Sequence, residues 1–171
     1  MKLLALDHIG VVVRDIDETV ARAGETVDGR AVGGRFVSDD IDLQVLMAGE
    51  STLELIEVRN AGFGMPRLKD GETAVIGHFG IEVEDLEDTK AELRRRGVVL
   101  EGEAETDEVR WIFTAPQTTF GVTLQLMEHK VTDAARQSKS SITSPPYSRR
   151  RTGYGAPPVT RQIAWRQDGT P

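Results

Sequence analysis

The chain has 171 residues, of which 39% are hydrophobic and 29% charged, as expected for a folded globular protein. Residues 1–129 carry 13 basic and 26 acidic side chains, whereas residues 130–171 carry 8 basic and 2 acidic ones. An acidic body disfavours nucleic acid as a partner. Because the chain has no cysteine, disulfides, thiolate catalysis and cysteine-ligated zinc are excluded.

The beginning of the chain has only a short apolar run, which Asp7 interrupts. A run of this length is too short for a signal peptide or a membrane span. We therefore expect a cytoplasmic protein that does not interact with membranes.

An internal repeat divides the sequence into two similar halves. Residues 8–19 match residues 78–89 at an offset of 70, and residues 51–57 match residues 122–128 at an offset of 71. Two separate segments that repeat at nearly the same spacing indicate a duplicated structural module.

The first module, residues 4–58, is predicted to contain a strand, a helix and three further strands. Apolar and β-branched residues at 8–13 predict its first strand. Asp15 or Asp17 can cap a helix that runs to about residue 27 before Asp28-Gly29 ends it. The remaining strands are expected at residues 35–37, 43–47 and 52–58.

A linker at residues 59–73, rich in glycine and polar residues, precedes the second module, residues 74–129. After the strand that starts at His78, Asp85 precedes a helix that is expected to end at Gly97. The remaining strands are expected at residues 98–100, 109–114 and 122–127. Each module therefore has the order βαβββ.

The end of the chain, residues 132–171, is dominated by Ser, Arg, Pro and Gly and has no apolar periodicity. We predict a disordered basic tail. It serves either as a spacer or as a docking segment for an anionic partner.

Side chains alternate between the two faces of a strand, so the repeated strands present two different surfaces. The apolar face should pack against the helices and carries Ile9, Val11, Val13, Leu53, Leu55, Phe79, Ile81, Val83, Leu124 and Leu126. Glu57 and Glu128 fall on the helix side near strand ends, where we expect exposed charges. We place His129 on the surface.

The opposite face carries polar groups at equivalent positions of the two modules. These groups are His8, Glu54, His78 and Gln125. Four such donors can converge on one point, and imidazole with oxygen ligands suits a divalent ion whose remaining positions are filled by water. Gly10 and Gly80 are expected to leave open space beside this site.

These segments resemble the vicinal oxygen chelate superfamily, which includes glyoxalase I, methylmalonyl-CoA epimerase, extradiol dioxygenases, and fosfomycin-resistance and bleomycin-binding proteins. The resemblance covers residues 4–129. It implies an α+β glyoxalase-like domain, residues 1–131, in which two βαβββ modules form an eight-stranded, cup-like mixed sheet. It also implies one divalent metal ion, chosen among Co, Ni, Mn, Zn and Mg, with ligands in the chain order His, Glu, His and Gln.

Residues 8–17, 54–55 and 116–122 most resemble methylmalonyl-CoA epimerase and its relatives. This resemblance implies a metal-dependent isomerase or lyase that transfers a proton next to a carbonyl through a metal-stabilised enolate. Its substrate would be an acyl-CoA or another small α-carbonyl compound, and paired subunits among the relatives imply a homodimer. Glu54 would be one acid/base group, and Asp39 or Asp40 the second.

Two departures from the epimerase pattern keep an alternative open. Gln125 stands where these enzymes usually have glutamate, and residues 115–117 read Ala-Pro-Gln where they often have His-Pro-Lys. A glutamine cannot act as a base, and it also disfavours the dioxygenase and fosfomycin-resistance patterns. The alternative is a non-catalytic small-molecule-binding protein of the same fold.

Overall fold

The computed structural model describes residues 1–60 and 65–130, so the predicted tail and part of the linker lie outside the described residues. The first module consists of β1 (Leu3–Val13), α1 (Ile16–Val27), β2 (Arg30–Val37), β3 (Ile41–Ala48) and β4 (Ser51–Val58). The second consists of β5 (Ala74–Val83), α2 (Leu86–Arg95), β6 (Leu100–Glu105), β7 (Val109–Thr114), a 3₁₀ turn at Pro116–Thr118 and β8 (Thr123–His129). This order confirms the duplicated βαβββ arrangement.

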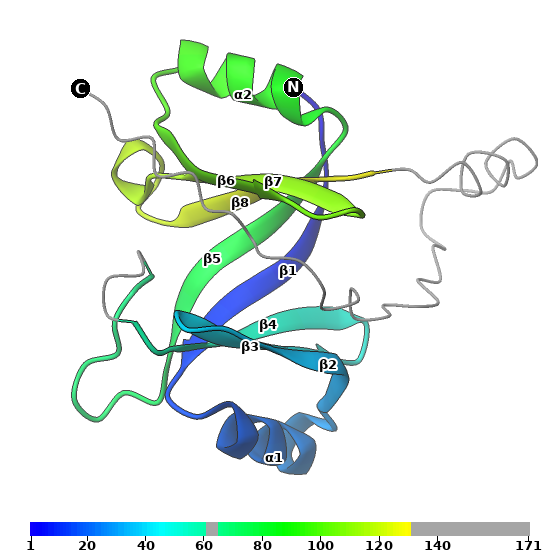
Figure 1. Ribbon diagram of the computed structural model, residues 1–171, viewed down its shortest axis with the longest axis vertical. Helices are drawn as coiled ribbons and strands as arrows, with labels where there is room; N and C mark the ends of the chain where they lie inside the picture. Colours follow the sequence, from blue (N-terminus) through cyan, green and yellow to red (C-terminus); the bar gives the residue numbers. More distant parts are fainter. Residues whose placement is uncertain (61–64, 131–171) are drawn as a thin grey trace, which may run out of the picture.

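All eight strands form one sheet in the order β2-β3-β4-β1-β5-β8-β7-β6. The first and last strands of each module are parallel, and the modules join edge to edge through the antiparallel pair β1 and β5. Figure 1 shows β1 and β5 crossing the middle of the molecule, with α1 and α2 at opposite ends. The predicted α+β fold with an eight-stranded, curled mixed sheet is therefore confirmed.

Each helix packs on its own half of the sheet and makes a separate hydrophobic core. Helix α1 covers a cluster of Val13, Ile16, Leu46 and Leu55, and helix α2 covers Val83, Leu86, Ile112 and Leu126. The predicted helix-facing side chains of β1, β4, β5 and β8 supply half of these residues. The other face of the sheet is thus left free for the polar groups.

The helices begin and end at the residues that the sequence indicates. Asp15 and Asp85 each accept a hydrogen bond from the backbone N–H three residues later, at 2.8 and 2.9 Å. Of the two candidate caps for α1, Asp15 is therefore the one used. Asp28 and Gly97 follow the helices with φ angles of 52° and 80°, the left-handed conformation that ends a helix.

Several strands differ from their expected positions, because β1 begins at Leu3 rather than residue 8, β5 begins at Ala74 rather than His78, and both edge strands are longer than expected. Strand β2 begins at Arg30 rather than residue 35, and β6 covers Leu100–Glu105 rather than residues 98–100. Both are edge strands with glycine and charged residues, a composition that natural edge strands use against unwanted pairing. Such residues hide the apolar alternation on which strand prediction depends.

Glu57 and Glu128 were expected to be exposed charges near strand ends, but both accept hydrogen bonds from backbone groups. The N–H of Ile16 donates to Glu57 Oε2 at 3.2 Å, and the N–H of Leu86 donates to Glu128 Oε2 at 2.6 Å. Each glutamate thus ties the last strand of its module to the first residue of its helix. Side-chain parity gave their face correctly, but it cannot reveal a backbone donor supplied by another element.

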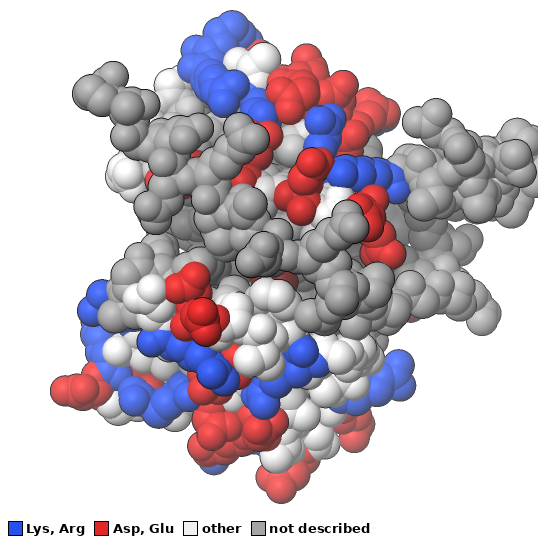
Figure 2. All heavy atoms as spheres, in the orientation of Figure 1, with Lys and Arg blue, Asp and Glu red and all other residues white. Residues whose placement is uncertain are grey.

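Charged side chains cover the outer surface of the helices. In α2 the first turn is acidic, with Glu87 and Asp88, and the last turn is basic, with Arg94 and Arg95. Figure 2 shows acidic and basic side chains at opposite ends of this helix. This polarity complements the helix dipole. Among the described residues, no helix is long and apolar enough to cross a membrane.

The replacement Glu128→Ala should lower the free energy of unfolding by about 1–2 kcal/mol, as expected when a helix start loses its acceptor. Glu128 also accepts a hydrogen bond from Arg110 at 2.7 Å, so that contact is lost as well. Urea unfolding followed by circular dichroism measures the change. As a control, Glu105→Ala removes a glutamate of the exposed pair with Lys130 and should change stability little. Equal effects of the two variants would contradict the capping role.

Candidate metal site

Cross-strand pairing places the predicted polar residues in two short rows on the inner face of the sheet. In one row Gly10 of β1 lies between Glu54 of β4 and His78 of β5. The row related to it by the internal repeat consists of Gln125, Gly80 and His8. Each row therefore holds one imidazole, one glycine and one oxygen donor.

The two glycines are required because the imidazole rings lie across them. A Cβ at Gly10 would overlap the ring of His78, and a Cβ at Gly80 would overlap the ring of His8. The expected open space beside the site is thus filled by the histidine of the opposite module. This close approach lets each ring lean across the central strand pair.

Three of the four predicted ligands converge on one point. The Nε2 atoms of His8 and His78 are 3.1 Å apart, and Glu54 Oε2 lies 3.3 Å from the nitrogen of His78 and 3.7 Å from that of His8. His8 and His78 are only 7% and 1% exposed. Donor atoms from three separate strands therefore meet in a buried position.

Gln125, the fourth predicted ligand, is also buried and lies next to Gly80 in the register of β5 and β8. Its Oε1 atom completes no hydrogen bond with the described residues, although the Gln125 side chain contributes to the raised pKa of His8. Burying an oxygen without a complete hydrogen bond costs free energy. A metal ion bound by the cluster would offset this cost by accepting the oxygen as a ligand.

The spacing of the three converging atoms fits a divalent ion. A point equidistant from them lies about 2.0 Å from each, which matches the roughly 2.0–2.2 Å of zinc bonds to histidine nitrogen and carboxylate oxygen. Imidazole with carboxylate oxygen also suits other first-row divalent metals. The residues present therefore fit the metal that the superfamily resemblance implies.

Electrostatics within the cluster favour an ionised carboxylate. Burial raises the pKa of Glu54, but the hydrogen bond to His78 and the charge of His8 outweigh it, and the pKa is lowered. Burial lowers the pKa of His8, but the hydrogen bond to Asp7 and the charge of Glu54 outweigh it, and the pKa is raised. Glu54 is thus a carboxylate at neutral pH.

Apolar groups surround the cluster on the same face. Val12, Ile56 and Met127 are buried there, and the ring of Phe113 meets that of His78 edge-on with centroids 5.5 Å apart. An apolar surrounding strengthens the electrostatic interactions of the charged groups that it encloses.

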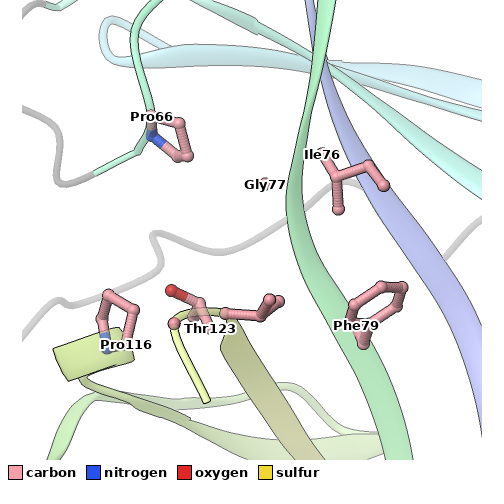
Figure 3. Close-up of a pocket in the computed structure, with 8 residues that line it drawn as sticks. Pro66, Ile76, Gly77, Phe79, Pro116 and Thr123 are labelled. Carbon is pink, nitrogen blue, oxygen red and sulfur yellow. The ribbon is translucent and has the colours of Figure 1, made fainter. Parts of the chain in front are cut away.

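A separate hollow of about 200 Å³ lies beside β5 and the 3₁₀ turn. Figure 3 shows Ile76 and Phe79 of β5 on one side of it, with Pro66, Pro116 and Thr123 around it. Its lining is mainly apolar and contains none of the converging ligands. Because Phe79 alternates with His78 along β5, this hollow is not the metal site itself.

The structure does not bring Asp39 and Asp40 to the cluster. Both lie in the turn between β2 and β3, where Asp40 Oδ1 accepts a hydrogen bond from the side chain of Asn60 at 2.7 Å. Glu54 pairs with Val45, five residues further along β3. At the rise of a strand this separation corresponds to about 16 Å along the sheet.

Asp7 was not among the predicted site residues, yet it contacts the cluster directly. Its side chain is 3% exposed, and its Oδ1 lies 3.0 Å from His8 Nδ1. The other oxygen, Oδ2, lies 3.3 Å from Nε2 of His129, whose side chain is 33% exposed. The signal in the sequence was an acidic residue within an apolar strand and directly before a candidate ligand.

Comparison with known proteins identifies the family. The chain matches the model of the Glyoxalase/Bleomycin resistance protein/Dioxygenase superfamily over residues 7–113. The protein therefore belongs to this superfamily. The matched region contains three of the candidate ligands and ends before Gln125.

Solved structures with the same fold include methylmalonyl-CoA epimerases. Methylmalonyl-CoA epimerase from Mycobacterium tuberculosis is 22% identical, with a TM-score of 0.65 over 78% of this chain and 93% of that one. A Streptomyces coelicolor methylmalonyl-CoA epimerase variant in complex with 2-nitronate-propionyl-CoA is 21% identical, with a TM-score of 0.64 over 76% and 100% of the chains.

A hypothetical protein from Bacillus halodurans C-125 is 23% identical, with a TM-score of 0.63 over 75% of this chain and 96% of that one. No curated protein matches the sequence. At these identities the similarity to solved structures establishes a shared fold.

Replacing Gly10 or Gly80 with alanine should weaken metal binding. The added methyl group overlaps an imidazole, and relieving an overpacked contact of this kind costs about 1–3 kcal/mol. If this cost is subtracted from the free energy of metal binding, the affinity falls roughly 5- to 150-fold. Titration with Zn²⁺ against a chelating dye measures the change. Gly34→Ala is the control, because a Cβ there meets no described atom within 4 Å. Unchanged affinity in both site variants would show that the rings need no such space.

Proposed function

We propose that the protein is a metal-dependent isomerase or lyase that moves a proton on the carbon next to a carbonyl group. The observation that carries the proposal is the convergence of two imidazoles and one ionised carboxylate in a buried, apolar position. The substrate class we propose is an acyl-CoA or a related α-carbonyl compound. The solved Streptomyces epimerase, described as a complex with 2-nitronate-propionyl-CoA, supports this class.

His8, His78 and Glu54 would hold the ion, with Gln125 as a fourth oxygen donor. A bound divalent ion supplies Lewis-acid stabilisation of the negative charge that develops on a carbonyl oxygen. The donor set is compatible with Co, Ni, Mn, Zn or Mg, with the nitrogen ligands favouring the transition metals and zinc.

Glu54 is the residue that we assign to proton transfer. Its side chain remains 20% exposed while both histidines are nearly buried, so Glu54 is the member of the cluster that a substrate can reach most easily. Because Gln125 has no ionisable group, the base at the cluster belongs to the first module. A single base can remove a proton and return it on the same side of the substrate, as the glyoxalase type of reaction requires.

Epimerisation needs a second acid/base group on the opposite side of the substrate carbon. Asp39 or Asp40 is our proposed second group. Both groups must reach the same α-carbon, whereas Asp40 lies about 16 Å along the sheet from Glu54 and is hydrogen-bonded to Asn60. The geometry therefore supports the single-base reaction more directly than epimerisation.

The replacement Glu54→Gln should slow solvent deuterium exchange at the α-carbon of propionyl-CoA or methylmalonyl-CoA by roughly 100- to 10,000-fold, the range for loss of a general base. The amide keeps one oxygen ligand, so metal content should fall less than activity. Mass spectrometry of the thioester in D₂O with metal-loaded protein measures the rate. Glu101→Gln, in which an exposed glutamate of β6 changes, is the control. Exchange at the wild-type rate in Glu54→Gln would refute the assigned role.

The variants Asp39→Asn and Asp40→Asn distinguish the two types of reaction. If either aspartate is the opposing group, its replacement should slow inversion of configuration at the α-carbon while leaving deuterium incorporation at that carbon in place. Chiral chromatography of the product, run beside the exchange assay, separates the two rates. Unchanged inversion in both variants would exclude these aspartates as the second group.

The alternative is a protein that binds a small molecule in this fold without turning it over, a possibility favoured by Gln125. Tight binding of metal and thioester without any proton exchange would support it. A homodimer and a cytoplasmic location also remain part of the proposal, and light scattering of the purified protein tests the first.

A further inference from the structure

Asp7 joins the buried cluster to a histidine at the surface. One of its carboxylate oxygens contacts Nδ1 of His8 at 3.0 Å and the other contacts Nε2 of His129 at 3.3 Å. The carboxylate is 3% exposed, so both contacts are shielded from water. Asp7 thus lies behind His8, on the side of the ring away from the converging Nε2 atom.

The contact between Asp7 and His8 determines which tautomer His8 adopts, and therefore which of its nitrogen atoms has a free lone pair. An ionised carboxylate only accepts hydrogen bonds, so the Nδ1 atom of His8 must carry a proton. In the neutral ring the lone pair is then on Nε2, the atom that lies 3.1 Å from Nε2 of His78. Carboxylates placed in this way fix both the tautomer and the orientation of metal-binding histidines.

The internal repeat shows that this support is present in one module only. The position equivalent to Asp7 is Gly77, one residue before His78. The Nδ1 atom of His78 is buried and has no hydrogen-bond partner among the described residues. His78 is instead held by the space over Gly10 and by the edge of Phe113.

We propose that Asp7 is a positioning residue that holds His8 in the tautomer able to bind a metal ion, with His129 fixing Asp7 from the surface side. The assignment rests on the proposed role of His8 as a ligand. It adds a functional carboxylate outside the ligand set, and it makes the two duplicated histidines unequal. His8 has a carboxylate behind its Nδ1 atom, whereas Nδ1 of His78 has no hydrogen-bond partner among the described residues.

Binding of Co²⁺ to the full chain, measured by competition with a chelating dye, tests this proposal without any substrate. Asp7→Ala should weaken binding by roughly 10- to 100-fold, the usual effect of losing a residue that supports a ligand. Asp42→Asn is the matched control. Asp42 is another buried aspartate of the same sheet, at 4% exposure, but it pairs with Arg59 instead of a ligand. The affinity of the Asp42→Asn variant for Co²⁺ should stay within about threefold of the wild-type affinity. This change is smaller than the loss of at least tenfold that is expected for Asp7→Ala.

Nitrogen NMR of the metal-free protein provides a readout that a purely structural role would not change. In the wild type His8 should show a protonated Nδ1, and in Asp7→Ala the signals should shift toward protonation at Nε2. Wild-type affinity in Asp7→Ala, an equal loss in Asp42→Asn, or an unprotonated Nδ1 in the wild type would overturn the proposal. If the wild type binds no Co²⁺, the proposed metal-dependent function is wrong. The nitrogen signals would still show whether Asp7 determines the tautomer of His8.

Discussion

The site depends on the way in which two imidazole rings cross two glycines at the junction of the modules. Antiparallel pairing of β1 with β5 sets His8 opposite Gly80 and His78 opposite Gly10. Since a glycine has no side chain, each ring lies over the neighbouring strand, and the two Nε2 atoms approach to 3.1 Å. A side chain at either glycine would occupy the position of an imidazole, so the candidate metal site and the joining of the two halves share one constraint.

The duplicated architecture carries an unequal distribution of charge. The first module supplies both carboxylates near the histidines, Asp7 and Glu54, whereas the equivalent positions of the second module are Gly77 and Gln125. Two histidines in symmetric positions therefore have different surroundings. Under the proposed function, ligand positioning and proton transfer would both fall to the first module, and the second module would contribute the neutral oxygen of Gln125 and the ring of Phe113.

Much of this architecture could be predicted from the sequence because the repeat and the alternation of strand residues are local patterns. Parity separated the helix-facing residues, such as Leu55 and Leu126, from the inner face, and it placed His8 and His78 together. Contacts between elements were less accessible. The backbone donors bound by Glu57 and Glu128 come from helix starts, and the distance of Asp40 from Glu54 follows from strand register. Such contacts are determined by tertiary packing, which local periodicity does not encode.

We propose that His8, Glu54 and His78 bind one metal ion at the junction of the modules. Anomalous diffraction from crystals grown with Co²⁺ would locate this ion. The expected result is a single strong anomalous peak per chain, with the two Nε2 atoms and the Glu54 carboxylate at bonding distance. Crystals of the folded protein that show no anomalous peak at that point, or that show the ion bound elsewhere, would rule out this metal site.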